Sequence, residues 1–115
     1  MRPMSAAFIL LLALITSAQC QQTEEDWYNK GYSLYDQGKY DEAIKAYDEV
    51  IRLDPKLAQA WYNNGVALRN QDKYDEAIKA YDEAIRLDPK LAQAWNNKDV
   101  ALDDKGLIRS SDQSL

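Results

Sequence analysis

Residues 27–60 read WYNKGYSLYDQGKYDEAIKAYDEVIRLDPKLAQA, and residues 61–94 repeat them as WYNNGVALRNQDKYDEAIKAYDEAIRLDPKLAQA, with 27 of 34 positions identical. The three tryptophans of the chain, Trp27, Trp61 and Trp95, therefore recur at this same interval. A fixed period of this length is typical of a stacked repeat array. The repeat predicts a stacked solenoid and makes binding, not catalysis, the default function.

The composition is that of one small domain. The chain has 115 residues, of which 46% are hydrophobic and 29% charged, so that disorder is not expected. The formal net charge of -5 comes from acidic residues interleaved with Lys and Arg along the repeats, which indicates solvated helix faces. Because no basic stripe is present, a nucleic-acid partner is not predicted.

Residues 1–20 differ in composition from the repeats. They have one cation (Arg2), an apolar run over residues 6–15, and then small and polar residues, which is the three-part layout of an export signal. The run is shorter than the about 20 residues that span a bilayer. The sequence predicts export, with cleavage before Gln19. An uncleaved N-terminal anchor or a buried helix is the alternative.

The single cysteine, Cys20, lies where a lipoprotein carries its acylated residue. The match is partial, because Ser17 and Gln19 stand where a lipoprotein signal has Leu and then Gly or Ala. A lipid on Cys20 is the minor alternative, and cleavage before Gln19 or Gln22 would leave this residue as a free thiol or remove it. One cysteine excludes an intramolecular disulfide. The protein is expected to be secreted or associated with the cell envelope, with membrane anchoring as an alternative.

Apolar residues recur at spacings of three and four along the repeats, which predicts helices and no sheet. Thr23 and Asp26 resemble a capping box that starts the first helix, and Gly38 is free to take the left-handed conformation that ends it. Asp-Pro pairs at 54–55 and 88–89 stop the second and fourth helices, because a residue before proline avoids the helical conformation. The predicted helices cover residues 24–37, 40–53, 56–71, 74–87 and 91–105, and the last ends at Gly106.

On these residues the chain resembles the tetratricopeptide repeat (TPR) family, whose 34-residue units are helix-turn-helix hairpins stacked into a superhelix. The resemblance is strong over residues 27–94 and weak over 95–105, and it implies an all-α solenoid of about five antiparallel helices. Small residues should allow each pair of helices to approach closely, while aromatic rings fill the wider layers. The matching scaffold residues are Trp27, Gly31, Ala43, Tyr47, Val50 and Pro55, then Trp61, Gly65, Ala77, Tyr81, Ala84 and Pro89, and finally Trp95.

Two departures from the family pattern affect the expected packing. Lys30 and Asn64 stand where the family has a large apolar residue, so that burial is lost there or the position is exposed. The third unit keeps Trp95 but has Asp99 and Ser111 where a glycine and an alanine should meet, and a carboxylate is costly in a dry contact. The predicted organisation is a polar lead-in (21–26), two repeats (27–60 and 61–94), a capping helix (95–105) and a loosely packed polar tail (106–115).

The sequence contains no pattern that carries catalytic or metal chemistry. It has no histidine and only one cysteine, which excludes His-dependent nucleophilic sites and thiol-based zinc sites. Its four glycines form no phosphate-binding loop. The acidic pair Asp41-Glu42 recurs as Asp75-Glu76, which marks the surface of a repeat and not a unique site. We predict that the protein is not an enzyme and uses no cofactor and no metal.

The resemblance implies a concave groove, lined by the first helix of each unit, that holds an extended peptide or a partner protein. Tyrosines at one end offer large and rigid contact surfaces, so that a neutral to mildly basic segment is expected. The family's clamp for a C-terminal carboxylate needs several cations, and only Arg69 is present. The alternative is that these tyrosines pack between helices. The predicted groove residues are Tyr28, Tyr32, Tyr35, Tyr62, Val66, Arg69, Asn96, Val100 and Asp103, beside a ladder of amides (Asn29, Asn63 and Asn97) able to bond a peptide backbone.

These features predict a non-catalytic protein-interaction module that binds its partner outside the cytoplasm. Two repeats and one helix make a thin solenoid, because about three repeats are usually needed for stability. One alternative is therefore a self-assembling structural element whose ends stack on another copy. A truncated relic of a longer array is the other alternative.

Overall fold

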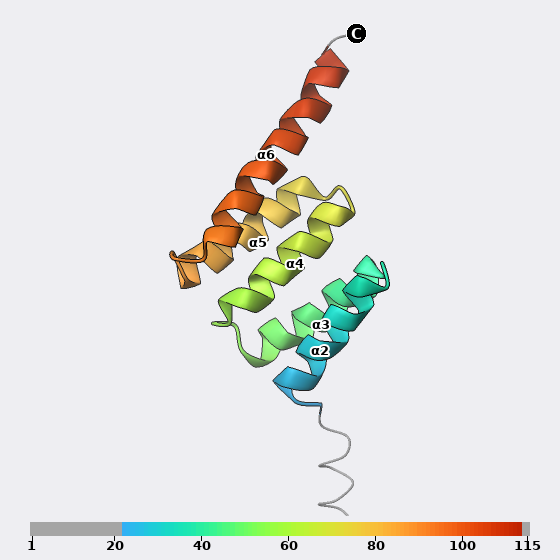
Figure 1. Cartoon of the computed structure of the whole chain (residues 1–115), viewed down its shortest axis with the longest axis vertical. Coiled ribbons are helices and arrows are strands. Elements are labelled where there is room, and N and C mark those ends of the chain that lie inside the picture. Colours follow the sequence, from blue (N-terminus) through green and yellow to red (C-terminus); the bar gives the residue numbers. More distant parts are fainter. Residues whose placement is uncertain (1–21, 114–115) are drawn as a thin grey trace, which may run out of the picture.

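The computed structural model describes residues 22–113 and shows five α-helices, each running opposite to the one before it (Figure 1). No strand occurs in this range, so the all-α prediction is confirmed. The helices are α2 (Glu24–Asp36), α3 (Tyr40–Leu53), α4 (Ala58–Asn70), α5 (Tyr74–Leu87) and α6 (Ala92–Gln113).

The helices form two hairpins and one covering helix. The most extensive contacts lie within each hairpin, between α2 and α3 and between α4 and α5. Further contacts join α3 to α4 and α5 to α6, and a smaller set joins α4 to α6. Figure 1 shows the hairpins stacked in chain order, with the last turns of α6 extending beyond α5. No helix within residues 22–113 combines the length and apolar character that crossing a membrane requires.

The first helix begins at the capping box expected from the sequence. The backbone nitrogen of Asp26 donates to the Thr23 hydroxyl at 3.1 Å, and the backbone nitrogen of Thr23 donates to the Asp26 carboxylate at 3.0 Å. Gly38 follows the end of α2 in the left-handed conformation, with a φ of 74°. The second repeat has Asp72 at this position with a φ of 61°, a conformation that aspartate tolerates better than most residues.

The loops between the hairpins are held by their Asp-Pro pairs. The Asp54 carboxylate accepts a hydrogen bond from the backbone nitrogen of Lys56 at 3.1 Å, and the indole of Trp61 donates to the Pro55 carbonyl at 3.0 Å. This turn uses residues 56 and 57, so α4 begins at Ala58 and not at Lys56 as the sequence suggested. The next loop repeats the arrangement, with Trp95 donating to the Pro89 carbonyl at 3.0 Å.

The predicted end of the fifth helix is wrong. The helix α6 runs to Gln113, so Gly106 lies inside it and residues 106–113 continue the capping helix instead of forming a separate tail. A glycine inside a helix costs only about 1 kcal/mol relative to alanine, and no proline follows to stop the chain. The predicted export signal and Cys20 lie outside the described residues, as does the side chain of Ser111.

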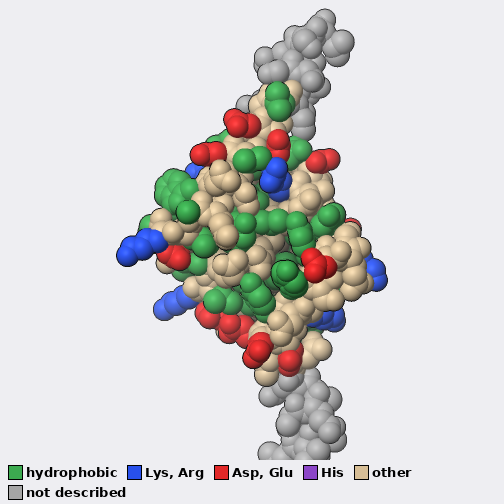
Figure 2. All heavy atoms as spheres, in the orientation of Figure 1, with side chains coloured by type: hydrophobic (Ala, Val, Ile, Leu, Met, Phe, Trp, Pro, Cys, Tyr) green, Lys and Arg blue, Asp and Glu red, His purple; other side chains and the backbone are tan. Residues whose placement is uncertain are grey.

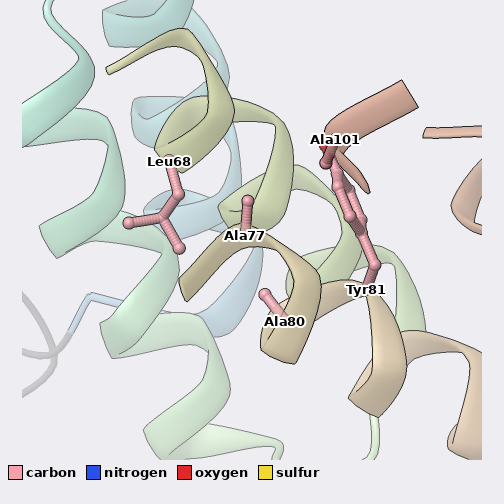
Figure 3. Packing of buried hydrophobic residues seen from close by; sticks show 5 residues of the cluster. All are labelled: Leu68, Ala77, Ala80, Tyr81 and Ala101. Carbon is pink, nitrogen blue, oxygen red and sulfur yellow. The ribbon is translucent and has the colours of Figure 1, made fainter. Parts of the chain in front are cut away.

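In the core Gly31 and Gly65 each face a tyrosine ring, whereas the sequence predicts that Gly31 meets Ala43 and that Gly65 meets Ala77. A Cβ built on Gly31 would lie 2.7 Å from the Tyr47 ring, and one on Gly65 would lie 2.6 Å from the Tyr81 ring. Both tyrosines are almost fully buried. Figure 3 shows the cluster at the centre of the stack, where α4, α5 and α6 contribute Leu68, Ala77, Ala80, Tyr81 and Ala101.

Lys30 and Asn64, the polar residues that stand where the family has a large apolar one, lie in different surroundings. Lys30 is exposed, and its ammonium lies 4.8 Å from the centre of the Trp27 ring. Asn64 is buried, and its side-chain nitrogen donates to the Asp48 carboxylate at 2.8 Å. Burial of Asp48 raises the pKa of its carboxyl, and the hydrogen bond from Asn64 opposes that shift. In the second repeat the apolar contact of the family is thus replaced by a polar one.

Candidate functional site

Most of the predicted groove residues of the first two units, but not Tyr28 or Arg69, come together at one cavity between α2 and α4. They surround a small open cavity of about 100 Å³, here called the tyrosine hollow, whose walls are Tyr32, Tyr35, Tyr47, Tyr62, Asn63 and Val66. All but Tyr47 belong to the predicted groove or amide ladder. In the orientation of Figure 2, hydrophobic side chains gather across the middle of the molecule, with acidic side chains toward both ends.

Hydrogen bonds between repeats hold the walls of the hollow. The side-chain nitrogen of Asn63 donates to the Tyr28 hydroxyl at 2.9 Å, and Asn70 donates to the Tyr35 hydroxyl at 3.1 Å. Asn97 likewise donates to the Tyr62 hydroxyl at 2.8 Å. Each bond joins the first helix of one unit to the first helix of the next.

These bonds give two members of the predicted amide ladder partners within the stack. Asn63 and Asn97 each donate to a tyrosine of the preceding unit, and the Asn63 oxygen also accepts from Gln59 at 3.2 Å. Asn29 is exposed, because α2 is the first helix of the described stack. The amides of Asn63 and Asn97 therefore each use one N–H to align the first helices of neighbouring units.

The tyrosines divide into buried and exposed members. Tyr28 packs edge-on against Tyr47 with ring centres 6.1 Å apart, and Tyr62 packs against Tyr81 at 6.0 Å. Burial raises the pKa of the Tyr62 hydroxyl, and the hydrogen bond from Asn97 opposes that shift. Tyr32, in contrast, is 57% exposed at the edge of the hollow. The packing alternative thus describes Tyr28 and Tyr62 well, whereas Tyr32 is available for contact.

The other end of the predicted groove is polar and acidic. The Arg69 guanidinium pairs with the Asp104 carboxylate at 3.2 Å, so that the one cation of the groove is already neutralised. Val66 and Val100 are half-buried, whereas Asn96 and Asp103 are exposed on α6. Within residues 22–107, whose side chains are described, no three acidic, cysteine or histidine groups are placed to hold a metal ion. The groove offers contact surface and negative charge.

The profile of the tetratricopeptide repeat family matches residues 28–92, which is more than half of the chain. The chain belongs to the tetratricopeptide repeat family. The resemblance drawn from Trp27, Gly31 and their counterparts in the second repeat is thereby confirmed. A comparison with curated protein sequences finds no match.

Solved TPR structures share the fold of this chain. The TPR2B domain of yeast Sti1, in complex with pHsp70, has a TM-score of 0.67 at 29% identity, over 68% of this chain and 62% of that one. The second TPR domain of Spaghetti (RPAP3), bound to the HSP90 peptide SRMEEVD, has a TM-score of 0.71 at 28% identity, over 85% of this chain and 91% of that one. The type III secretion translocator chaperone SycD of Yersinia enterocolitica has a TM-score of 0.72 at 27% identity, over 75% of this chain and 65% of that one. The chain thus spans less than two thirds of the Sti1 and SycD structures.

Sequence reasoning missed the polar contacts between units, although the spacing contains a signal for them. The pairs Tyr28–Asn63 and Tyr62–Asn97 are both separated by 35 residues, one more than the repeat. Two residues that are one repeat plus one residue apart lie on the first helices of neighbouring units, where they can face each other. Tyr47, predicted as a scaffold residue, also lines the hollow, and Gly31 leaves room for its ring.

Proposed function

We propose that this TPR chain is a non-catalytic protein-interaction module that holds an extended segment of a partner protein in the tyrosine hollow. The observation that carries the proposal is the open cavity of about 100 Å³ with Tyr32 exposed at its edge. Aromatic side chains with few rotatable bonds are enriched among the residues that dominate protein interfaces. Membership of the TPR family supports a binding role, and the Sti1 and Spaghetti structures hold partner segments on the same fold.

The charges along the groove favour a neutral to mildly basic segment. Asp103 of the predicted groove is exposed on α6, and Arg69 is paired with Asp104. A ligand with a free C-terminal carboxylate would meet these carboxylates without an unpaired cation to bind it. A segment with one or two Lys or Arg residues would instead gain favourable, salt-sensitive attraction.

We place the binding outside the cytoplasm. The support is the order of Arg2, the apolar run over residues 6–15 and the small residues before Gln19. A lipid on Cys20, or a retained N-terminal segment, would instead tether the module to a membrane. The intact mass of the protein isolated from its own cells tests this part of the proposal, because cleavage before Gln19, acylation of Cys20 and retention give three different masses.

End-to-end stacking is the less favoured function because the first helix is polar where later helices are apolar. Ala60 and Ala94 are fully buried at the start of α4 and α6, whereas the equivalent residue of α2 is the exposed Asp26. Further along the helix, the buried Ala67 corresponds to the exposed Ser33 of α2. A preceding copy would have to desolvate both polar groups, which is unfavourable without new partners.

The proposal is tested with an array of extended peptides of graded charge and the full-length chain. Tyr32→Ala should weaken capture of the peptides that bind by about tenfold or more, as expected of an aromatic residue that is one of the few dominating an interface. The matched control is Lys79→Ala, which removes an exposed side chain on α5, away from the hollow. Both variants should melt at the wild-type temperature. Equal capture by Tyr32→Ala and wild type would refute binding in the hollow.

A further inference from the structure

A second concave surface lies at the N-terminal end of the stack, between α2 and α3. This surface, here called the N-terminal slot, has a volume of about 520 Å³. Trp27, Leu34 and Ala46 supply its apolar walls, and Lys30, Glu42 and Glu49 are among its charged residues. None of its residues lines the tyrosine hollow. The slot is therefore a separate site.

The second repeat shows what covers the same positions when a helix is present. Residues Lys30 and Leu34 correspond to Asn64 and Leu68 of that repeat. The helix α3 lies over both, because Asn64 donates to Asp48 at 2.8 Å and Ile44 packs against the cluster that contains Leu68. Only 8% of Leu68 is exposed.

In the third unit a lysine takes the place of Asn64 in this contact, and the slot likewise has a lysine, Lys30, at that position. The Lys98 ammonium, which corresponds to Lys30, lies 2.7 Å from the Asp82 carboxylate of α5. Further along α6, the Lys105 ammonium pairs with the Asp75 carboxylate. Wherever a helix fills the position, its carboxylates meet the polar residues of the next first helix.

The helices that fill these positions share one pattern. In α3, Asp41 and Asp48 lie seven residues apart with Ile44 between them, and Gln71 donates to Asp41 as Asn64 does to Asp48. In α5 the same pattern is made by Asp75, Ile78 and Asp82. On α2 the corresponding positions are Gln37, Leu34 and Lys30. Leu34 and Lys30 line the slot, and Gln37, whose amide donates to the Ser33 hydroxyl at 3.2 Å, lies one turn further along α2.

Two occupants within reach of the chain fit the slot poorly. A second copy stacking its last helices on α2 would bury Asp26 and Ser33, which replace buried alanines. The chain's own residues 1–22 include no acidic side chain to meet Lys30. A separate helix that carries its own carboxylates supplies the acidic partner that residues 1–22 lack.

We propose that the N-terminal slot binds a single amphipathic helix of another protein, with two acidic residues seven apart and a branched apolar residue three after the first. The first acid faces Gln37, the apolar residue covers Leu34, and the second acid pairs with Lys30. Contact by one helix buries less surface than a standard interface of about 1,600 Å², so the binding belongs to the weak, transient class. The site is distinct from the tyrosine hollow, and its partner need not be the same protein.

The probe is a synthetic peptide with the sequence YDEAIKAYDEVIRL (residues 40–53), which carries a photoreactive group at its sixth residue. The control peptide replaces the aspartate equivalent to Asp48 by lysine. Both are titrated against the full-length wild-type chain and against Lys30→Glu, a change at an exposed position that should not alter folding. Cross-linked sites are mapped by mass spectrometry.

The wild-type chain should bind the aspartate peptide about three- to tenfold more tightly than the lysine peptide, which is the range of one exposed ion pair against one like-charge contact. Lys30→Glu should reverse that order, with cross-links on α2 and α3. Equal affinity of the two peptides for both chains, or no binding by either, overturns the proposal. Cross-links on α4 or α6 would show that the peptide displaces the chain's own α3 or α5. Cross-links on Tyr32 would show that it binds in the tyrosine hollow. Either result also overturns it.

A separate variant distinguishes this proposal from binding in the hollow. Tyr32→Ala should leave the affinity for the aspartate peptide unchanged, and Lys30→Glu should leave capture of extended peptides unchanged. Loss of both activities in either variant would mean that one surface, and not two, accounts for binding, and the slot proposal would then be wrong.

Discussion

The Asn63 amide donates a hydrogen bond of 2.9 Å to the Tyr28 hydroxyl and thereby ties the first helix of one repeat to the first helix of the next. Asn97 and Tyr62 form the same bond one unit later, at 2.8 Å. Because Tyr28 also packs on Tyr47, a single side chain supports both the hairpin and the stack. The wall of the tyrosine hollow is therefore positioned by contacts that also stabilise the fold.

Tyr28→Phe should lower the free energy of unfolding by about 0.5–1.5 kcal/mol, because it removes the acceptor of a partly buried amide while keeping the ring. Urea unfolding followed by circular dichroism measures this difference. The control is Tyr32→Phe, which changes a 57% exposed residue and should shift stability by less than about 0.5 kcal/mol. Equal effects of the two changes would mean that the Asn63 bond adds nothing to the stack.

Gly31→Ala and Gly65→Ala should each destabilise the chain by about 1–3 kcal/mol. A methyl group would lie 2.7 Å from the Tyr47 ring in the first case and 2.6 Å from the Tyr81 ring in the second, and both rings are buried too deeply to move freely. The gain in helix propensity, about 1 kcal/mol, offsets only part of that cost. Thermal melting of the purified variants measures the balance.

Gly106 provides the matched control for these two glycines. It lies inside α6, and nothing comes within 4 Å of a Cβ built on it. Gly106→Ala should therefore stabilise the chain by up to about 1 kcal/mol through helix propensity alone. A destabilising effect would show that the chain is not helical at Gly106, and would support the shorter fifth helix that the sequence suggested.

The elements that the sequence predicted well are those set by neighbouring residues. Thr23 with Asp26, Gly38 and the Asp-Pro pairs each determine the local backbone, and the helices begin or end at or near them. The end of α6 was missed because no such signal stands there. Gly106 was read as a stop, although a glycine alone, without a residue such as proline after it, does not end a helix.

Several residues predicted to share one groove lie together in the structure, but the hydrogen bonds between them were not predicted. Family resemblance placed Tyr32, Tyr35 and Tyr62 in one groove, and they do line one hollow. The bond from Asn63 to Tyr28 depends on how neighbouring units are placed against each other, and the sequence of one unit does not show that placement. The same holds for the bond between Asn64 and Asp48, which gives a polar residue a partner at a position expected to be apolar.

The two buried tyrosines predict how stability depends on alkaline pH. Burial raises the pKa of the Tyr47 and Tyr81 hydroxyls above the ordinary value of 10.0. The unfolded chain therefore loses these protons first. The stabilising effect is complete below about pH 10 and is lost as the pH rises from there toward the folded-state pKa, with a slope of up to about 1.4 kcal/mol per pH unit for each tyrosine.

Tyr81→Phe should flatten this alkaline slope by the contribution of one tyrosine. Near neutral pH it should be neutral or slightly stabilising, because the Tyr81 hydroxyl is buried without a hydrogen-bond partner among the described residues. Urea titrations at pH 7, 10 and 11 measure both effects. Tyr32→Phe, at an exposed position, is the control. If the free energy of unfolding of Tyr81→Phe falls with pH as steeply as that of the wild type, Tyr81 does not stay protonated in the folded chain.

Leu68 and Leu102 occupy equivalent positions in successive units, and their difference tests whether the stack ends at α6. Leu68 is 8% exposed beneath α3 and α5, whereas Leu102 is 45% exposed because no further helix pairs with α6 within the described chain. Leu68→Ala should cost about 2–5 kcal/mol, and Leu102→Ala less than about 1 kcal/mol. Both costs should be independent of protein concentration. A cost for Leu102→Ala that approaches that of Leu68→Ala and grows with concentration would show that a second copy covers α6, and would favour the self-assembling alternative over a monomeric interaction module.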